Sequence, residues 1–567
     1  MSKERNNTTK CSWLVAAMML VACLSAAGVL PVEAQDTGTG HAAHSVLRNG
    51  AWYRLAIPTT GIYGVTTDNV AELAGVSIGR VGVYGQPGGM LSESNADARP
   101  DDLPQLSAMV VDNNGNGVFD ASDRLVFYAQ GADAWRYGED SLFHHERNGY
   151  DNHNYVFLRL DGMAKGVSTA ATVAVQGEPI QYFDYRAVHD VDEVNTHEGG
   201  IVWVGERFSA GAAQRTITMT LPGVPRYGQV DAAYALASLS PSATFSVDLN
   251  GGGTTSLSFS KYKPYESRHT RFSVTSAMLN FNISYHSDGS GLGYLDYIVV
   301  NAQVPLRFQN GQTAFRSVRT TNGNATYAIA NANGAMQVWD VTDYDSVVAV
   351  PITLNGSTAS FTAPHDEIRE YVAFDGSHYL SPSAVAAVEC QDLHGQANPD
   401  MVIVANAAYV QQAQALASLH DICDNLSTLV VTDRQVFNEF SGGKQDPMAL
   451  REMMRMFYKR HAQNNALPAP RYLLLFGKGS YDNRDILKHG ATTVVTYVSQ
   501  TSFSEDYAYS SDDLFGYLDD DETGETYESL DLSIGRLPAK SKAEADLFVK
   551  KITRYMTRAD LNDSTQR

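Results

Sequence analysis

The sequence has 567 residues, of which 44% are hydrophobic, and a formal net charge of −21 at pH 7. Nucleic acids and anionic lipid surfaces repel such an acidic chain, so we expect neither as a partner. The length favours about three domains. Four cysteines are too few for a disulfide framework, so packing must stabilise the core.

Residues 1–34 have the pattern of an export signal. Basic residues precede an apolar stretch over residues 13–30, and a small-residue cleavage site ends at Ala34. The sequence before Cys23 also resembles a lipoprotein processing box, in which Cys23 would be lipidated. The apolar stretch continues past Cys23, which favours ordinary cleavage. No later segment has the apolar length of a membrane-spanning helix.

A β-rich domain is predicted over residues 35–198. Short runs rich in β-branched and aromatic residues alternate with Gly, Pro and Asp turns. The predicted strands cover residues 52–57, 62–66, 80–84 and 124–128.

A loop at residues 112–123 of this domain has the spacing of a calcium site. Oxygen side chains stand at loop positions 1, 3, 5, 9 and 12, a main-chain carbonyl is available at position 7, and Gly117 at position 6 permits the tight bend. A plain Asn/Gly hairpin between strands is the alternative, and both readings stay open. The predicted ligands are Asp112, Asn114, Asn116, Val118, Asp120 and Asp123. The acidic loop at residues 519–525 lacks a closing carboxylate and is read as a solvated turn.

Residues 199–385 are predicted to form a β-sandwich-like domain. Strict alternation of apolar and polar residues over 216–221 and 244–249 is typical of half-buried antiparallel strands. No catalytic motif is recognisable in this domain, so we expect it to bind a partner or to act as a spacer between domains.

From about residue 386 the pattern changes to α/β. Continuous apolar strands are predicted at residues 401–405, 428–432 and 472–476, with amphipathic helices between them. This order predicts a parallel sheet, whose functional edge lies at the carboxyl ends of the strands. The loops after Phe476, Val498 and Ile534 are therefore expected to line the site.

Three motifs in this α/β region stand in a specific order. They are Leu473-Leu-Leu-Phe-Gly-Lys-Gly-Ser-Tyr-Asp-Asn-Arg484, Ser511-Asp-Asp-Leu-Phe-Gly516 and Ile534-Gly-Arg-Leu-Pro538. Together they resemble the gingipain family of cysteine peptidases, and within it the type IX secretion sortases of the Bacteroidetes. The resemblance implies that residues 386–567 form a gingipain-type, caspase-like α/β peptidase domain behind N-terminal β-rich domains.

The same resemblance implies a function. A sortase of this kind is an endopeptidase that cleaves the C-terminal secretion signals of exported proteins at the outer membrane or cell surface. Its expected partners are those exported proteins and other outer-membrane secretion components. The alternative is a non-catalytic surface module for binding or adhesion, whose peptidase domain is degenerate.

No catalytic residue can be assigned by this resemblance. In the family the catalytic His and Cys follow the Ile-Gly-Arg-Leu-Pro segment, whereas here no His follows His489 and no Cys follows Cys423. The pairs Cys390/His394 and His420/Cys423 are more often structural than catalytic. Asp482 occupies the place of the third glycine of a dinucleotide loop. We therefore expect the N-terminal part of a longer peptidase, inactive by itself.

Overall fold

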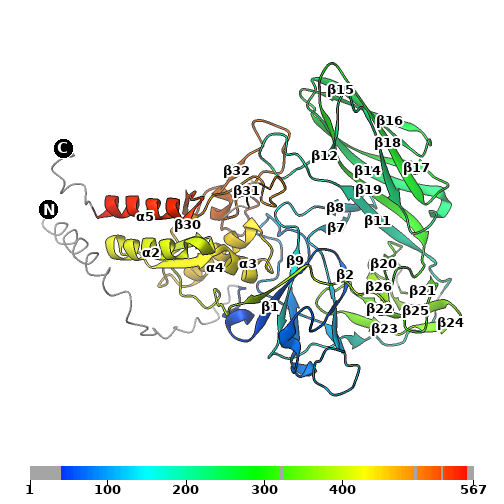
Figure 1. The fold of residues 1–567 in the computed structure, drawn as a ribbon, viewed down its shortest axis with the longest axis horizontal. Helices are drawn as coiled ribbons and strands as arrows, with labels where there is room; N and C mark the ends of the chain where they lie inside the picture. The colour runs from blue at the N-terminus through cyan, green and yellow to red at the C-terminus, as the bar shows by residue number, and fades with distance from the viewer. Residues whose placement is uncertain are drawn as a thin grey trace.

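The computed structural model describes residues 40–175, 177–319, 323–488, 490, 494–524 and 528–557. The predicted export signal, with Cys23, lies outside the described residues. Figure 1 shows the helices of the C-terminal part on one side of the molecule and the β-rich units on the other. This is the predicted multidomain architecture of β-rich domains followed by an α/β domain. Among the described helices none is both long and apolar enough to cross a bilayer.

The first β unit contains a five-stranded sheet and a three-stranded sheet. The order of the larger sheet is β27-β1-β9-β3-β4 and that of the smaller is β2-β6-β5. Its buried core includes Leu55, Tyr63, Phe127 and Leu158. The strands are β1 (Trp52–Ile57), β2 (Gly61–Val65), β3 (Gly82–Gly85), β4 (Gln105–Leu106), β5 (Ala108–Val111), β6 (Arg124–Ala129), β9 (Asn154–Arg159) and, far along the chain, β27 (Ala384–Val388).

The sandwich is formed by two packed antiparallel sheets, as the alternating sequence predicts. One has the order β11-β19-β14-β17 with β12 beside β19, and the other the order β13-β18-β15-β16. Alternate residues of β15 are buried, and Phe245 lies 4.7 Å from Tyr285 between ring centroids. The strands are β11 (Tyr182–Asp190), β12 (Gly205–Phe208), β13 (Gln214–Thr220), β14 (Gln229–Ser238), β15 (Ser242–Leu249), β16 (Thr254–Ser260), β17 (Tyr265–Ser273), β18 (Met278–Ser287) and β19 (Gly293–Pro305).

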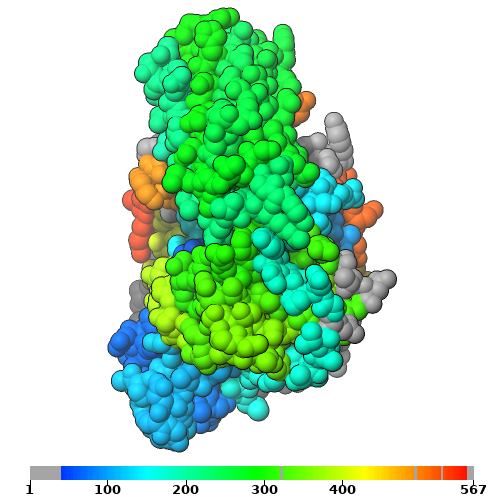
Figure 2. Space-filling view, turned by 90° about the vertical axis from the view of Figure 1, so that its right-hand side faces the viewer, coloured from blue at the N-terminus to red at the C-terminus, as the bar shows by residue number. Residues whose placement is uncertain are grey.

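A second β unit follows the sandwich. Its sheets have the orders β10-β23-β22-β26-β20 and β21-β25-β24. One continuous core runs from Phe245 of the sandwich to Tyr371 of this unit, and Figure 2 shows the two stacked along one face. The strands are β10 (Ser168–Thr169), β20 (Gln312–Arg316), β21 (Asn324–Ala330), β22 (Gln337–Asp340), β23 (Val348–Val350), β24 (Thr353–Asn355), β25 (Thr358–Pro364) and β26 (Glu370–Phe374).

The predicted domain limits at residues 198 and 385 do not coincide with breaks in strand pairing. β11, before residue 198, pairs with β19, after it. β27 spans residue 385 and pairs with β1. Between these limits lie most of the sandwich and nearly all of the second β unit.

The α/β unit has a four-stranded parallel sheet in the order β29-β28-β30-β33. Both faces of β28 are covered: Val402 and Val404 pack with α3 and α4, and Ile403 packs with α2 and α5. Continuous burial explains why its strands lack polar alternation. The strands are β28 (Met401–Ala405), β29 (Thr428–Thr432), β30 (Tyr472–Phe476) and β33 (Ser533–Leu537), and the helices are α2 (Val410–Asp424), α3 (Asp433–Phe440), α4 (Pro447–Gln463) and α5 (Lys542–Met556).

One expectation for this unit needs correction. Val498 belongs to β31 (Tyr497–Val498), which pairs with β32 (Ser510–Ser511) outside the parallel sheet. At the start of α5, the Ser541 side chain accepts from the Glu544 amide, and the Glu544 carboxylate accepts from the Lys540 amide. One further pair, β7 (Ala134–Tyr137) and β8 (Phe143–Glu146), forms a separate hairpin.

Candidate functional site

Arg536 holds the three motifs of the α/β unit together at the carboxyl edge of the sheet. Its guanidinium donates to both carboxylate oxygens of Asp512, at 2.7 and 2.6 Å. It also donates to the main-chain carbonyls of Gly477, Val494 and Val495, at 3.0–3.1 Å. A planar, always charged guanidinium is suited to such forked contacts. The three motifs, which are separate in the sequence, therefore form one local assembly.

Gly479 and Asp482 shape the loop that follows β30. A Cβ at Gly479 would lie 3.0 Å from Cβ of Thr496, so a larger residue would require Thr496, just before β31, to shift. Asp482 is buried and accepts from the amides of Ile486 and Leu487, at 2.8 and 2.9 Å. These bonds stabilise a turn in the loop. They explain why residue 482 is an aspartate and not the third glycine of a dinucleotide-binding loop.

The two Cys/His pairs are not brought together at this edge. Cys390 is exposed and donates to the Gly50 carbonyl at 3.3 Å, whereas His394 is fully buried. On α2, Nδ1 of His420 lies 2.8 Å from the Asp424 carboxylate. Because α2 runs back from the carboxyl end of β28, its last turn lies at the opposite edge of the sheet. That neither pair is the catalytic His and Cys of the family remains a prediction.

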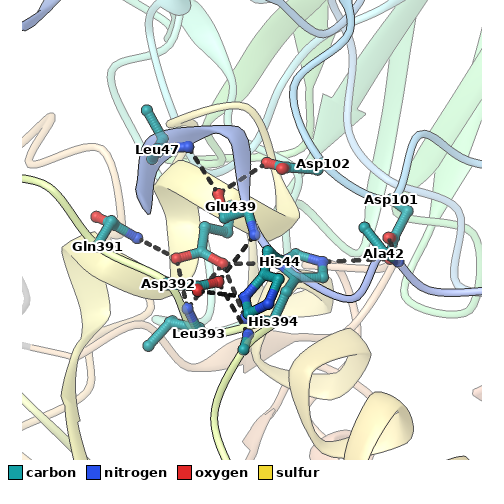
Figure 3. Close-up of polar contacts among 12 residues, drawn as sticks. Ala42, His44, Leu47, Asp101, Asp102, Gln391, Asp392, Leu393, His394 and Glu439 are labelled. Atoms are coloured by element: carbon teal, nitrogen blue, oxygen red, sulfur yellow. Dashed lines mark hydrogen bonds and ion pairs between the residues drawn. The ribbon is translucent and has the colours of Figure 1, made fainter. Parts of the chain in front are cut away.

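A buried polar network centred on His394 was not predicted (Figure 3). Nδ1 of His394 lies 2.7 Å from Oε2 of Glu439, and its Nε2 lies 3.4 Å from Oδ1 of Asp101. Glu439, on α3, is fully buried and also accepts from the amides of Leu393 and His394. The network thus joins the α/β unit to the 99–104 loop of the first β unit.

The same network fixes the N-terminal segment at residues 41–46. Nδ1 of His41 lies 2.5 Å from Asp101, and Nδ1 of His44 lies 2.7 Å from Asp392. Asp102 accepts from the Val46 amide at 2.7 Å. The histidines and the Asp101-Asp102 pair were visible in the sequence, but about 60 residues separate His41 from Asp101, and no local pattern connects them.

Electrostatics make His394 a cation at neutral pH. Burial alone would lower its pKa, but the Asp101 and Glu439 carboxylates beside the ring outweigh burial and raise the pKa to about 10. Burial likewise favours the neutral form of Asp101, yet His394 and His41 hold the pKa of Asp101 well below its usual range. Burial raises the pKa of Asp102 to about 6. Because its ring is fully buried between two carboxylates that belong to different units, His394 has a structural role at this junction.

The predicted calcium loop joins the antiparallel strands β5 and β6. The Asp112 carboxylate accepts from the amides of Gly115 and Gly117, at 2.7 and 2.9 Å. Asp123 is almost fully buried and accepts from the amides of Asn113 and Asp120, at 3.0 and 2.9 Å. Gly117 has φ +74°, a conformation that favours glycine. Both readings, ion site and hairpin loop, are compatible with this geometry.

In the part of the chain that the structure describes, the loop at residues 112–123 included, no group of three or more His, Cys, Asp or Glu residues is arranged to hold an ion. Asp520 of the acidic loop pairs instead with Arg455 and Lys459. Calcium at residues 112–123, through Asn and main-chain oxygens as well as carboxylates, remains a prediction.

Residues 394–567 match peptidase family C25. This part of the chain is a C25 domain. The crystal structure of dimeric latent PorU from Porphyromonas gingivalis superposes on 91% of the chain with a TM-score of 0.78 and 27% sequence identity. The match covers 50% of the PorU chain, so this chain spans about half the length of PorU. These findings confirm the gingipain-type domain and the overall fold class.

Two further solved structures match about a fifth of the chain. One is a carbohydrate-binding module, CBM36, in complex with calcium and xylotriose: 12% identity, 20% of this chain, 97% of that one and a TM-score of 0.14. Another is the C-terminal CBM6 of LamC from Zobellia galactanivorans: 17% identity, 21% of this chain, 98% of that one and a TM-score of 0.14. Scores this low support no inference. No curated protein matches this chain significantly.

Proposed function

We propose that the protein is a cysteine endopeptidase that acts as a type IX secretion sortase and removes C-terminal secretion signals from exported proteins. The supporting observation is the extent of the similarity to PorU. The C25 match covers residues 394–567, whereas the shared fold extends over 91% of the chain and therefore includes the β-rich units. A peptidase that shared only its catalytic domain with PorU would not retain these units.

The same proposal assigns the protein a place and partners. It would be exported by the signal at residues 1–34 and held at the outer membrane or cell surface. Its substrates would be exported proteins with C-terminal secretion signals, and its neighbours other secretion components of the outer membrane.

The test is cleavage by the protein encoded by the whole gene. Purified protein is incubated with an exported protein that carries its C-terminal secretion signal, and the product is weighed by mass spectrometry. We expect a single cut that releases the signal, and loss of the cut after thiol alkylation, because a cysteine peptidase needs its thiolate.

Cys390 provides the matched control. It is an exposed free thiol, so alkylation would modify it whether or not it takes part in catalysis. A Cys390→Ser variant should cleave normally and should still be inactivated by alkylation. Binding of the substrate without any cut would contradict the sortase proposal and favour the non-catalytic binding module.

A further inference from the structure

A cavity of about 550 Å³ lies where the hairpin of β7 and β8, the sandwich and the second β unit meet. Figure 1 shows β11 of the sandwich beside β20 of the second β unit at this place. A neighbouring cavity of about 350 Å³ extends to the turn between β1 and β2. Cavities of this size are in the range of small-ligand sites. The two cavities share the lining residues Thr60, Arg186, Asn310, Gln312, Ala314 and Arg316.

These walls are basic, although the chain is acidic overall. Arg186, Arg307 and Arg316 line the larger cavity, and none of the described residues that line it is acidic. Among the described residues that line the smaller cavity, Glu370 is the only acidic one. Three guanidinium groups and one carboxylate therefore leave two positive charges without a counter-charge.

The buried arginines share Glu370. Nη1 of Arg186 lies 3.1 Å from Oε1 of Glu370, and Nε of Arg316 donates to Oε2 of Glu370 at 2.7 Å. The side chain of Arg316 is 6% exposed and that of Arg186 is 17% exposed. A buried cation is costly unless an anion or an acceptor lies beside it. Glu370 compensates for only one of the two charges.

Two further donors are available at the cavity. Arg307 is exposed at its edge and forms no ion pair with another described residue. Oε1 of Gln312 accepts from the Ile62 amide at 2.9 Å, whereas the buried Nε2 of Gln312 has no hydrogen-bond partner within the described part of the chain. A buried donor without an acceptor is rare in folded proteins, so it indicates a place for a missing acceptor.

The protonation equilibrium of Arg186 agrees with the excess of positive charge. Burial and the neighbouring Arg316 guanidinium lower the pKa of Arg186 to about 10, although Glu370 opposes the shift. A bound anion would favour the charged form of Arg186. The ligand that fits these walls is therefore an anion.

Charge and the number of acceptor atoms distinguish between anions. A carboxylate has one negative charge and two oxygens. A phosphate monoester has a charge of about −1.5 to −2 at pH 7 and three strong acceptor oxygens. The ester matches the two uncompensated arginine charges and the unpaired Gln312 amide. Guanidinium groups also suit phosphate because they form forked hydrogen bonds with it.

An aromatic wall lies beside the arginines. Trp135, Phe183 and Tyr185 line the larger cavity. The centre of the Arg186 guanidinium is 5.1 Å from the centroid of the Trp135 ring. Aromatic rings such as these pack against the organic part of an ester, whereas inorganic phosphate would leave them uncovered.

We propose that this cavity binds a small organic phosphate monoester, with the phosphate group at Arg186, Arg316 and Gln312 and the organic part beside Trp135. Arg307 neutralises the second charge of the phosphate at the cavity edge. Binding requires no peptide cleavage, so the inference goes beyond the proposed sortase activity and is tested independently of it.

Isothermal titration calorimetry of the 567-residue chain with phenyl phosphate measures the binding. Phenyl sulfate is the matched ligand, since it has nearly the same shape but a single negative charge. We expect saturable binding of phenyl phosphate at neutral pH and about tenfold weaker binding of phenyl sulfate, the loss typical of one charged hydrogen bond. Inorganic phosphate should also bind about tenfold more weakly, because it leaves the aromatic wall uncovered. No binding of phenyl phosphate, or equal affinities for the three ligands, would overturn the proposal.

A pair of exposed arginines locates the site with little risk to folding. Arg307→Gln removes the charge at the cavity edge and should weaken binding of phenyl phosphate about tenfold. Arg268→Gln changes an exposed arginine on β17 of the sandwich that lines neither cavity, and this variant should bind like the unaltered chain. Equal affinities of the two variants would contradict the assignment.

Gln312→Glu separates ligand binding from a purely structural role. The new carboxylate can still accept from the Ile62 amide, but it replaces the unpaired donor by a negative charge in the same wall. We expect loss of phenyl phosphate binding together with an unchanged or higher melting temperature, because the added carboxylate compensates for the buried arginines. Undiminished binding in this variant would show that the phosphate lies elsewhere.

A photoreactive ligand provides a measurement without any variant. The azide-bearing analogue azidophenyl phosphate is crosslinked to the unaltered chain, and the adducts are mapped by mass spectrometry. Adducts at Trp135 or Tyr185 are expected. Adducts confined to other surfaces would overturn the proposal.

Discussion

At the scale of single residues, a few buried ionic groups determine how the C25 domain is assembled. Arg536 contacts Asp512 and three main-chain carbonyls, and His394 lies between Glu439 and Asp101. Removing one member of such a set leaves the others buried without a partner. That penalty, more than the attraction itself, decides the cost of substitution.

Arg536→Lys should destabilise the C25 domain by about 3 kcal/mol, because an ammonium cannot reproduce the forked contacts. Calorimetric unfolding and hydrogen exchange of the amides around β33 measure the effect. Arg471→Lys is the control, since its ion pair with Asp400 is half exposed and such pairs contribute about 0–1 kcal/mol. Equal effects of the two substitutions would contradict the role given to Arg536.

His394→Gln should lower the free energy of unfolding by about 3–5 kcal/mol at neutral pH, as expected when a buried ion pair loses one partner. The pKa of His394 in the folded state, about 10, lies above its usual value of 6.5. Its stabilising contribution is therefore complete below pH 6.5 and is lost as pH rises towards 10. Glutamine does not titrate in this range.

The difference in stability between the two proteins should thus shrink between pH 6.5 and 10, as followed by urea unfolding. His420→Gln alters a half-exposed pair with Asp424 and should change stability by only about 0.5 kcal/mol at any pH. A penalty for His394→Gln that grows with pH would show that His394 is neutral when buried.

At the scale of elements, the way each strand is buried explains its sequence pattern. β28 is buried on both faces by different helices, whereas β15 buries alternate residues. Phe119 of the loop between β5 and β6 packs into the core, whereas residues 113–116 are exposed. The Asp112 and Asp123 carboxylates accept from amides of the same loop. An ion bound by this exposed part would add contacts that packing does not supply.

Calcium is predicted to bind the loop at residues 112–123 and to raise the melting temperature of the chain. An ion that binds only the folded state stabilises it by about 2.7 kcal/mol at a hundred times its dissociation constant. Chelation should reverse the rise, and Asp112→Ala should abolish it. Asp521→Ala, in the acidic loop read as a solvated turn, should retain it. A calcium response that survives Asp112→Ala would place the ion elsewhere.

At the scale of the whole molecule, the two cysteines of the described part lie away from the carboxyl edge of the C25 sheet. Cys390 follows β27 on the first β unit, and Cys423 lies in the last turn of α2. Neither is placed beside an imidazole at the edge where α/β enzymes bind substrates.

We therefore predict that the 567-residue chain alone shows no thiol-dependent peptidase activity. The measurement is a fluorogenic peptide assay beside the protein encoded by the whole gene, with Cys423→Ala and Cys390→Ser as variants. Cleavage by the 567-residue chain that disappears in Cys423→Ala would make the His420/Cys423 pair the site.

The sequence alone determined the strands at 52–57, 401–405 and 472–476 and the family of the C-terminal part. These features depend on periodicity and on neighbours within a few residues, which are visible in a single chain. Tertiary structure decided the pairing of β1 with β27, the Arg536–Asp512 contact and the His394 network. Each joins residues that are distant in sequence, and their proximity depends on how the separate units pack, which no local pattern encodes.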